Sequence, residues 1–180
     1  MCASWIQCDL LRLRFTDAFY KVPLRLAEQR YFAFWYRGSV HVYTRIAQGS
    51  LDGPSLYGRL SSFVGRATQS LVSTSEARLQ VYTDDPIVVL RGKNVDIENT
   101  ITKLLAVWRC LGIELAFKKG HTGPAVNWIG HLLTIDQDSK TVTAQIKPEF
   151  LQGLLCDTLA LKKRNAITYK ALRSYTDRAN

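Results

Sequence analysis

Two adjacent carboxylates, Asp84 and Asp85, stand between two apolar segments, 79–82 and 87–90. Two apolar segments around a short polar turn are typical of a β-hairpin, and their strongly apolar character predicts a central position in a sheet. Such a hairpin would hold the carboxylates rigidly, as Mg²⁺ requires of its oxygen ligands. Two Mg²⁺ ions can activate a hydroxyl group and stabilise a leaving pyrophosphate. The alternative is a solvated turn, because aspartate is common at hairpin tips.

The strands that must position this turn are predicted from short apolar segments. Residues 10–15 predict a strand, and the aromatic segment 31–36 with residues 40–43 predicts a second hairpin. Further strands are expected at 126–133 and 142–146. Together with the acidic hairpin, these segments supply enough strands for an antiparallel sheet.

Apolar residues at helical spacing mark two long segments. The first, 56–71, follows Pro54, which suits the first turn of a helix. The second, 97–111, precedes Gly112, a residue type that often follows the last turn of a helix. Another helix is expected after residue 148, and a basic, helix-like stretch follows to residue 178. This order of elements predicts an α+β fold, with an antiparallel sheet backed by two helices.

The composition fits one folded domain or slightly more. The chain has 180 residues, of which 47% are hydrophobic, so it can form a real core. Its 24 basic and 15 acidic residues give a net charge of +9. Such an excess suits a polyanionic partner, because each phosphate that a cation neutralises releases counterions.

The four cysteines show no metal-binding spacing. Cys2, Cys8, Cys110 and Cys156 form no CxxC pair, and no histidine stands at zinc-ligand spacing from them. They predict free thiols in a reducing compartment. No apolar run is long enough to span a membrane, and the N-terminus lacks the pattern of a secretory signal. We therefore expect an intracellular protein, cytoplasmic or nuclear, without a membrane partner.

The acidic turn resembles a known polymerase motif. Tyr82, Thr83, Asp84 and Asp85 match the Tyr-x-Asp-Asp box of reverse transcriptases, which are RNA-directed DNA polymerases. Four further segments resemble motifs of the retroviral and retrotransposon enzymes, in the same order along the chain. These segments, with the sequences DAFYKVPL, AQGSLDGP, LGIELAFKK and NWIGHLL, begin at residues 17, 47, 111 and 127.

The resemblance implies nucleotide-binding roles for residues before the acidic turn. In the family, the aspartate matching Asp17 lies near the incoming triphosphate, and the ring matching Phe19 lies under the sugar, where it excludes a 2′-hydroxyl group. Gln48 would hydrogen-bond near the nucleotide or template, and Gly49 would allow close backbone approach. Taken alone, Phe19 also fits a core aromatic residue, and Gln48 and Gly49 also fit an ordinary loop before a helix.

The resemblance also implies roles for residues after the acidic turn. Lys119, or alternatively Lys118, would lie near the triphosphate and assist the leaving group. Trp128 and Gly130 match the Trp-x-Gly primer grip, a hairpin that steers the 3′ end of the primer. The alternatives are a solvated pair of lysines and, for Trp128, a core aromatic residue.

As a whole, the resemblance implies a polymerase palm over residues 1–145, with the fingers mostly missing. Residues 146–180 would form the helical start of a thumb or connection. Two Mg²⁺ ions would be held by Asp84 and Asp85. The implied substrates are deoxynucleoside triphosphates, on an RNA or DNA template–primer, and the implied partners include other parts of a retroelement polyprotein.

One position departs from the family pattern. The first catalytic aspartate lies three residues before the position of Asp17, where this chain has Arg14. A cation cannot ligate Mg²⁺ and would repel the ions from Asp84. Asp9 lies five residues earlier, too far along an extended strand, and Asp17 could replace the missing ligand only through a local shift.

Three functions therefore stay open. The first is template-directed DNA synthesis by two-metal phosphoryl transfer. The second is a catalytically dead retroelement remnant that at most binds nucleic acid through phosphates. The third is a reading frame whose product is only marginally folded.

Overall fold

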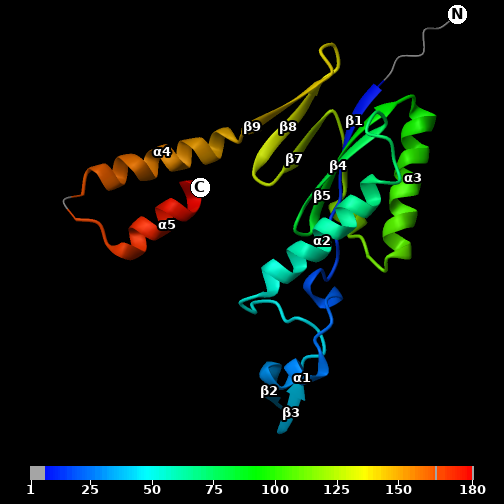
Figure 1. The fold of residues 1–180 in the computed structure, drawn as a ribbon. Helices are drawn as coiled ribbons and strands as arrows, with labels where there is room; N and C mark the ends of the chain where they lie inside the picture. The colour runs from blue at the N-terminus through cyan, green and yellow to red at the C-terminus, as the bar shows by residue number, and fades with distance from the viewer. Residues whose placement is uncertain (1–6, 165, 180) are drawn as a thin grey trace, which may run out of the picture.

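The computed structural model describes residues 7–164 and 166–179 (Figure 1). Cys2 lies outside the described residues; Cys8 is buried, and Cys110 and Cys156 are exposed, all three as free thiols. At the centre lies a four-stranded antiparallel sheet in the order β4-β5-β1-β6. Its strands are β1 (Gln7–Arg12), β4 (Ala77–Tyr82), β5 (Asp85–Gly92) and β6 (His121–Gly123).

Two long helices cover one face of this sheet. They are α2 (Gly53–Gln69), which packs on β4, and α3 (Asn94–Cys110), which packs on β5. The core between them contains Leu11, Val88, Leu90 and the fully buried Trp108. Gly112 follows α3 with a φ of 70°, in the left-handed region that glycine adopts readily. The predicted sheet backed by two helices is confirmed.

A second antiparallel sheet covers the other face. Its order is β7-β8-β9, with β7 (Ala125–Trp128), β8 (His131–Asp136) and β9 (Thr141–Ile146). Val126 and Ile135 from this sheet pack with Leu10 and Ile87 from the central one. Strands β1 and β5 are therefore buried on both faces, which explains why residues 87–90 are continuously apolar rather than alternating.

A small subdomain projects from the main body (Figure 1). It comprises α1 (Leu26–Gln29), which was not predicted, and the hairpin of β2 (Ala33–Tyr36) and β3 (Ser39–Val42). The predicted hairpin is confirmed, but residues 30–32 form a 3₁₀ turn rather than the start of the strand. Every residue of β2 and β3 is exposed.

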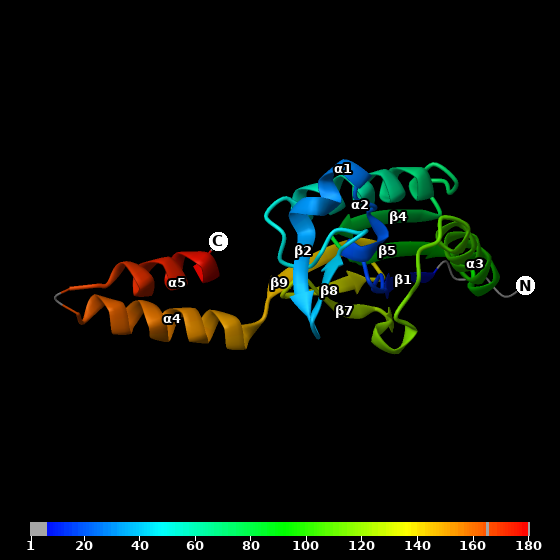
Figure 2. The same ribbon diagram turned by 90° about the horizontal axis from the view of Figure 1, so that it is seen from below.

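Two helices at the C-terminal end lie beside each other and extend away from the sheets in both views (Figure 1, Figure 2). They are α4 (Pro148–Lys162) and α5 (Tyr169–Ala179), and they are joined by a hydrogen bond of 2.9 Å between the hydroxyl groups of Thr158 and Tyr175. Both helices were expected. The division of the chain into a palm and a thumb or connection stays a prediction.

Three predicted boundaries were wrong. The strand expected at 10–15 begins at Gln7 and ends at Arg12. The turn of the acidic hairpin is shorter than expected, because β5 begins at Asp85. Residues 126–133 are not one strand but parts of β7 and β8, joined by a turn at Ile129 and Gly130. None of the helices in the described part of the chain has the length and apolar character needed to cross a membrane.

Candidate functional site

The acidic turn lies at the tip of the β4–β5 hairpin. Tyr82 pairs with Asp85 across the two strands, so Thr83 and Asp84 alone form the turn. Thr83 has a φ of 53°, a left-handed conformation that two-residue hairpin turns commonly require. Asp84 therefore projects from the turn itself, whereas Asp85 is the first residue of a central strand. Both side chains are partly buried, at 24% and 21% exposure.

The chain beyond β1 runs on beside this tip. The backbone N–H of Leu13 donates to the carbonyl of Pro86 at 3.1 Å, and that of Phe15 donates to the carbonyl of Asp84 at 2.8 Å. Leu13 and Phe15 are buried in the core under the helices. Because successive side chains of an extended chain point to opposite faces, Arg12 and Arg14, which alternate with Leu11, Leu13 and Phe15, face away from this core. That alternation directs Arg12 and Arg14 toward the carboxylates.

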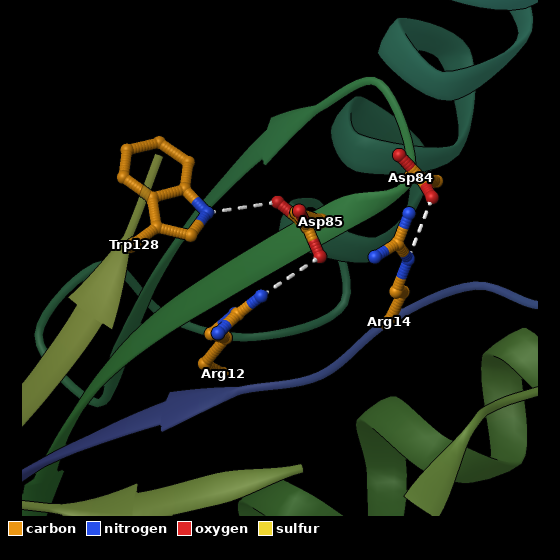
Figure 3. A network of polar contacts seen from close by, with 5 residues as sticks. All are labelled: Arg12, Arg14, Asp84, Asp85 and Trp128. Atoms are coloured by element: carbon orange, nitrogen blue, oxygen red, sulfur yellow. Dashed lines mark hydrogen bonds and ion pairs between the residues drawn. The ribbon is translucent and has the colours of Figure 1, made fainter. Parts of the chain in front are cut away.

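Each carboxylate forms an ion pair with one of these arginines (Figure 3). Arg14 Nε donates to Asp84 Oδ2 at 2.9 Å, and Arg12 Nη2 lies 3.5 Å from Asp85 Oδ1. Sequence reasoning identified Arg14 but missed Arg12. The signal for Arg12 was present, since residues two apart in a strand share a face. Together, the two guanidinium groups offset the charge of the two carboxylates.

The residues at this tip do not fit a pair of Mg²⁺ ions. In the part of the chain that the structure describes, no three acidic, histidine or cysteine side chains gather where they could hold a metal ion. Asp84 and Asp85 supply only two carboxylates, and a cation contacts each of them. Mg²⁺ prefers several oxygen ligands in near-octahedral geometry. Arg14, which contacts Asp84, stands where the resemblance leads one to expect a third carboxylate.

A cavity of about 420 Å³ opens beside Asp84. Most of the residues expected to bind a nucleotide contribute to its lining: Asp17, Phe19, Gln48 and Lys119. Lys118, the alternative to Lys119, and Gly49 do not line it; Gly49 has a φ of 93° in the adjoining loop. The fold thus brings together, in one cavity, residues as far apart in the sequence as Asp17 and Lys119.

Tyr57 packs against Phe19, which lines this cavity, and it was not singled out from the sequence. Its ring lies 5.4 Å from that of Phe19, measured between centroids, and the residue is buried on α2. Burial raises the pKa of the Tyr57 hydroxyl far above its usual value, and the negative charge of Asp84 raises it further. Tyr57 therefore stays neutral and acts as a support for Phe19. No sequence pattern distinguishes it from other helix residues.

Trp128 also contacts the acidic hairpin. Its indole N–H donates to the backbone carbonyl of Asp85 at 2.9 Å, from the end of β7 (Figure 3). Gly130 follows in the β7–β8 turn, where it has a φ of 75° and Ile129 has one of 47°. The structure thus places Trp128 against Asp85, one of the two predicted catalytic residues, and Gly130 in the exposed turn that follows Trp128.

The hydrogen bond from Trp128 gives a stability prediction. Trp128→Phe keeps a ring in place but removes the donor to Asp85, so we expect a loss of about 1 kcal/mol in the free energy of unfolding. Urea denaturation followed by circular dichroism measures this loss. Trp35→Phe, at a position that is 71% exposed, is the matched control and should change stability by less than about 0.5 kcal/mol. Equal effects of the two changes would contradict the prediction.

Comparisons with known proteins define the fold. No protein-family model matches the sequence, and no significant match to a curated protein was found. Solved structures do match. A foamy viral protease-reverse transcriptase in complex with dsDNA gives a TM-score of 0.66 at 20% identity, over 94% of this chain and 26% of that one. The same kind of protein in complex with an RNA/DNA hybrid gives 0.63 at 20% identity, over 94% and 20%.

These similarities show a reverse-transcriptase-like fold of helices and antiparallel sheet. A further structure of the foamy viral protein with dsDNA has a TM-score of 0.62 at 20% identity, over 96% of this chain and 32% of that one. This chain therefore spans about a third or less of the length of the proteins that it matches.

Proposed function

We propose that this chain is a palm-like domain that binds nucleic-acid duplexes through their phosphates and no longer catalyses metal-dependent polymerisation. The observation that carries the proposal is the pairing of Arg12 with Asp85 and of Arg14 with Asp84. Bare carboxylates repel a phosphate backbone unless metal ions lie between them. Two guanidinium groups remove that repulsion without any metal, so the tip can lie against a phosphate backbone.

The charge of the whole chain supports this proposal. A net charge of +9 attracts a polyanion of any sequence, since counterion release depends on phosphates rather than on bases. The matching foamy viral proteins are in complex with dsDNA or an RNA/DNA hybrid. We infer that the partner of this chain is a template–primer duplex of the same general kind.

The second candidate is template-directed DNA synthesis from deoxynucleoside triphosphates, with Mg²⁺ held by Asp84 and Asp85. The cavity that gathers Asp17, Phe19 and Lys119 beside Asp84 favours it. The ion pairs of both carboxylates count against it, because Arg12 and Arg14 would have to move away. Primer extension on a primed RNA template, with Mg²⁺ or Mn²⁺, separates the two candidates. Incorporation that an Asp84→Asn variant abolishes would establish the second.

The proposed binding predicts a salt dependence without a metal dependence. We expect the affinity for a 20-base-pair duplex to fall at least about tenfold between 50 and 200 mM salt, as release of a few counterions requires. Fluorescence anisotropy measures it, with DNA duplexes of two unrelated sequences as the matched controls. The two sequences should bind equally well, and removing Mg²⁺ with EDTA should not weaken their binding. Binding that needs Mg²⁺, or that salt leaves unchanged, would contradict the proposal.

A further inference from the structure

The β2–β3 hairpin carries a row of aromatic rings that the core does not use. Phe34 lies 4.9 Å from Tyr43 and 5.5 Å from His41, measured between ring centroids, and His41 lies 5.9 Å from Tyr36. Phe34 and Tyr36 are two positions apart on β2, and His41 pairs with Phe34 across the hairpin. These four residues, which we name the aromatic ladder, therefore share one face of the hairpin.

The rings of the aromatic ladder are accessible. Phe34 is 41% exposed and Tyr36 is 51% exposed, although large aromatic side chains usually bury most of their surface. The opposite face carries Trp35, paired with Val40, and both are also exposed. The hairpin projects from the main body, away from the β7–β9 sheet and the C-terminal helices (Figure 1). It thus offers a row of partly exposed rings to a partner.

The charge around the aromatic ladder indicates the kind of partner. Residues 20–45 contain five basic side chains and one acidic one, Glu28. The guanidinium group of Arg37 lies 5.1 Å from the centroid of the Tyr36 ring, and that of Arg30 lies 4.8 Å from the centroid of the neighbouring Tyr31 ring. An apolar protein surface would leave these cations without counterions. A strand of nucleic acid would supply phosphates to the arginines and bases to the rings.

We propose that the aromatic ladder is a binding site for single-stranded nucleic acid, whose bases stack on Phe34, His41 and Tyr36 while Arg30 and Arg37 contact the phosphates. Stacking on aromatic side chains tolerates any base, because every base has a π-face. The site is separate from the acidic hairpin and does not depend on the duplex binding proposed above. It would let the chain hold an unpaired strand next to a duplex.

The test uses the full chain and two fluorescein-labelled probes of 20 units, oligo(dT) and an abasic strand with the same number of phosphates. Tyr36→Ala should weaken binding of oligo(dT) about tenfold, which is within the range for loss of one stacked base. It should leave binding of the abasic strand unchanged, because no charge is altered. Tyr36→Phe keeps the ring and should restore the affinity for oligo(dT).

Trp35→Ala is the matched control, since it removes a more exposed ring from the same hairpin but from the opposite face. It should leave the affinity for oligo(dT) unchanged. Equal loss with both variants, or equal loss with both probes, would overturn the proposal. The proposal would also be overturned if the chain did not bind oligo(dT) and instead associated with itself, and if Tyr36→Ala abolished that self-association. Binding of a blunt duplex is measured separately. If the wild-type chain did not bind the duplex, only the duplex proposal would be refuted. Tyr36→Ala should leave the affinity for the duplex unchanged.

Discussion

Replacing Arg14 with aspartate is expected to make the stability of this protein depend on divalent metal ions. The change removes the cation that lies 2.9 Å from Asp84 and puts a carboxylate of its own beside Asp84. Both effects are unfavourable without metal, and since Arg14 and Asp84 are only partly buried we expect a loss of about 2 kcal/mol. Differential scanning calorimetry in EDTA measures the loss as a lower Tm than that of the wild-type chain.

Addition of Mg²⁺ should then stabilise Arg14→Asp but not the wild-type chain. If the new site binds Mg²⁺ with a Kd of about 1 mM, 10 mM Mg²⁺ stabilises the variant by about 1.4 kcal/mol. Arg14→Gln, which removes the cation without adding a ligand, should not respond to Mg²⁺. Neither should Arg25→Asp, which makes the same change of charge at an exposed position. A wild-type Tm that rises with Mg²⁺ as much as that of Arg14→Asp would refute the claim that Arg14 keeps Mg²⁺ away from Asp84.

Trp108→Ala is expected to cause the largest loss of stability of any change discussed, about 3–5 kcal/mol. Trp108 is fully buried on α3, and its ring meets that of Phe15 edge-on at a centroid distance of 5.4 Å. Its indole N–H also donates to Thr68 Oγ1 at 3.0 Å, which joins α3 to α2. The loss is a large part of the 5–15 kcal/mol that holds a typical domain folded. Urea denaturation followed by far-UV circular dichroism measures it.

A second variant separates packing from hydrogen bonding at this position. Thr68→Val keeps the volume of the side chain but leaves the Trp108 N–H without its acceptor, so we expect a loss of about 1–3 kcal/mol. Trp35→Ala, at an exposed position, should cost no more than about 0.5 kcal/mol. A loss below 1 kcal/mol for Trp108→Ala would show that α3 does not depend on this residue.

The parts of the fold with strong local signals could be predicted from the sequence. The hairpin around Asp84 has an apolar strand on each side, and α3 has both a helical stripe and Gly112 after its end. These features depend on residues that lie within a few positions of one another, so local sequence patterns are enough to predict them. The resemblance assigned nucleotide-binding roles to Asp17, Phe19, Gln48 and Lys119. All four line the cavity beside Asp84, and their roles stay predictions.

The features that were missed are set by contacts between distant segments. Tyr57 supports Phe19 only because α2 packs against residues 19–21, and helical spacing alone does not show which neighbour a helix residue meets. Helix α1 is four residues long and has no side-chain cap, so its sequence contains no signal that marks the start of a helix. The turn between β7 and β8 contains Ile129, a β-branched residue in a left-handed conformation, where turn patterns lead one to expect asparagine or glycine.

The central place of β1 has a consequence for the order in which the chain folds. The β4–β5 hairpin joins neighbouring segments and can form early, whereas Arg14 and Asp84 are 70 residues apart along the chain. Closing so long a loop costs more entropy than forming a hairpin, so contacts of this kind tend to form late. During synthesis, β1 therefore has no strand to pair with until the β4–β5 hairpin has been synthesised. We infer that the two acidic residues spend the early stages of folding without their arginines, and that the docking of β1 is the event that neutralises them.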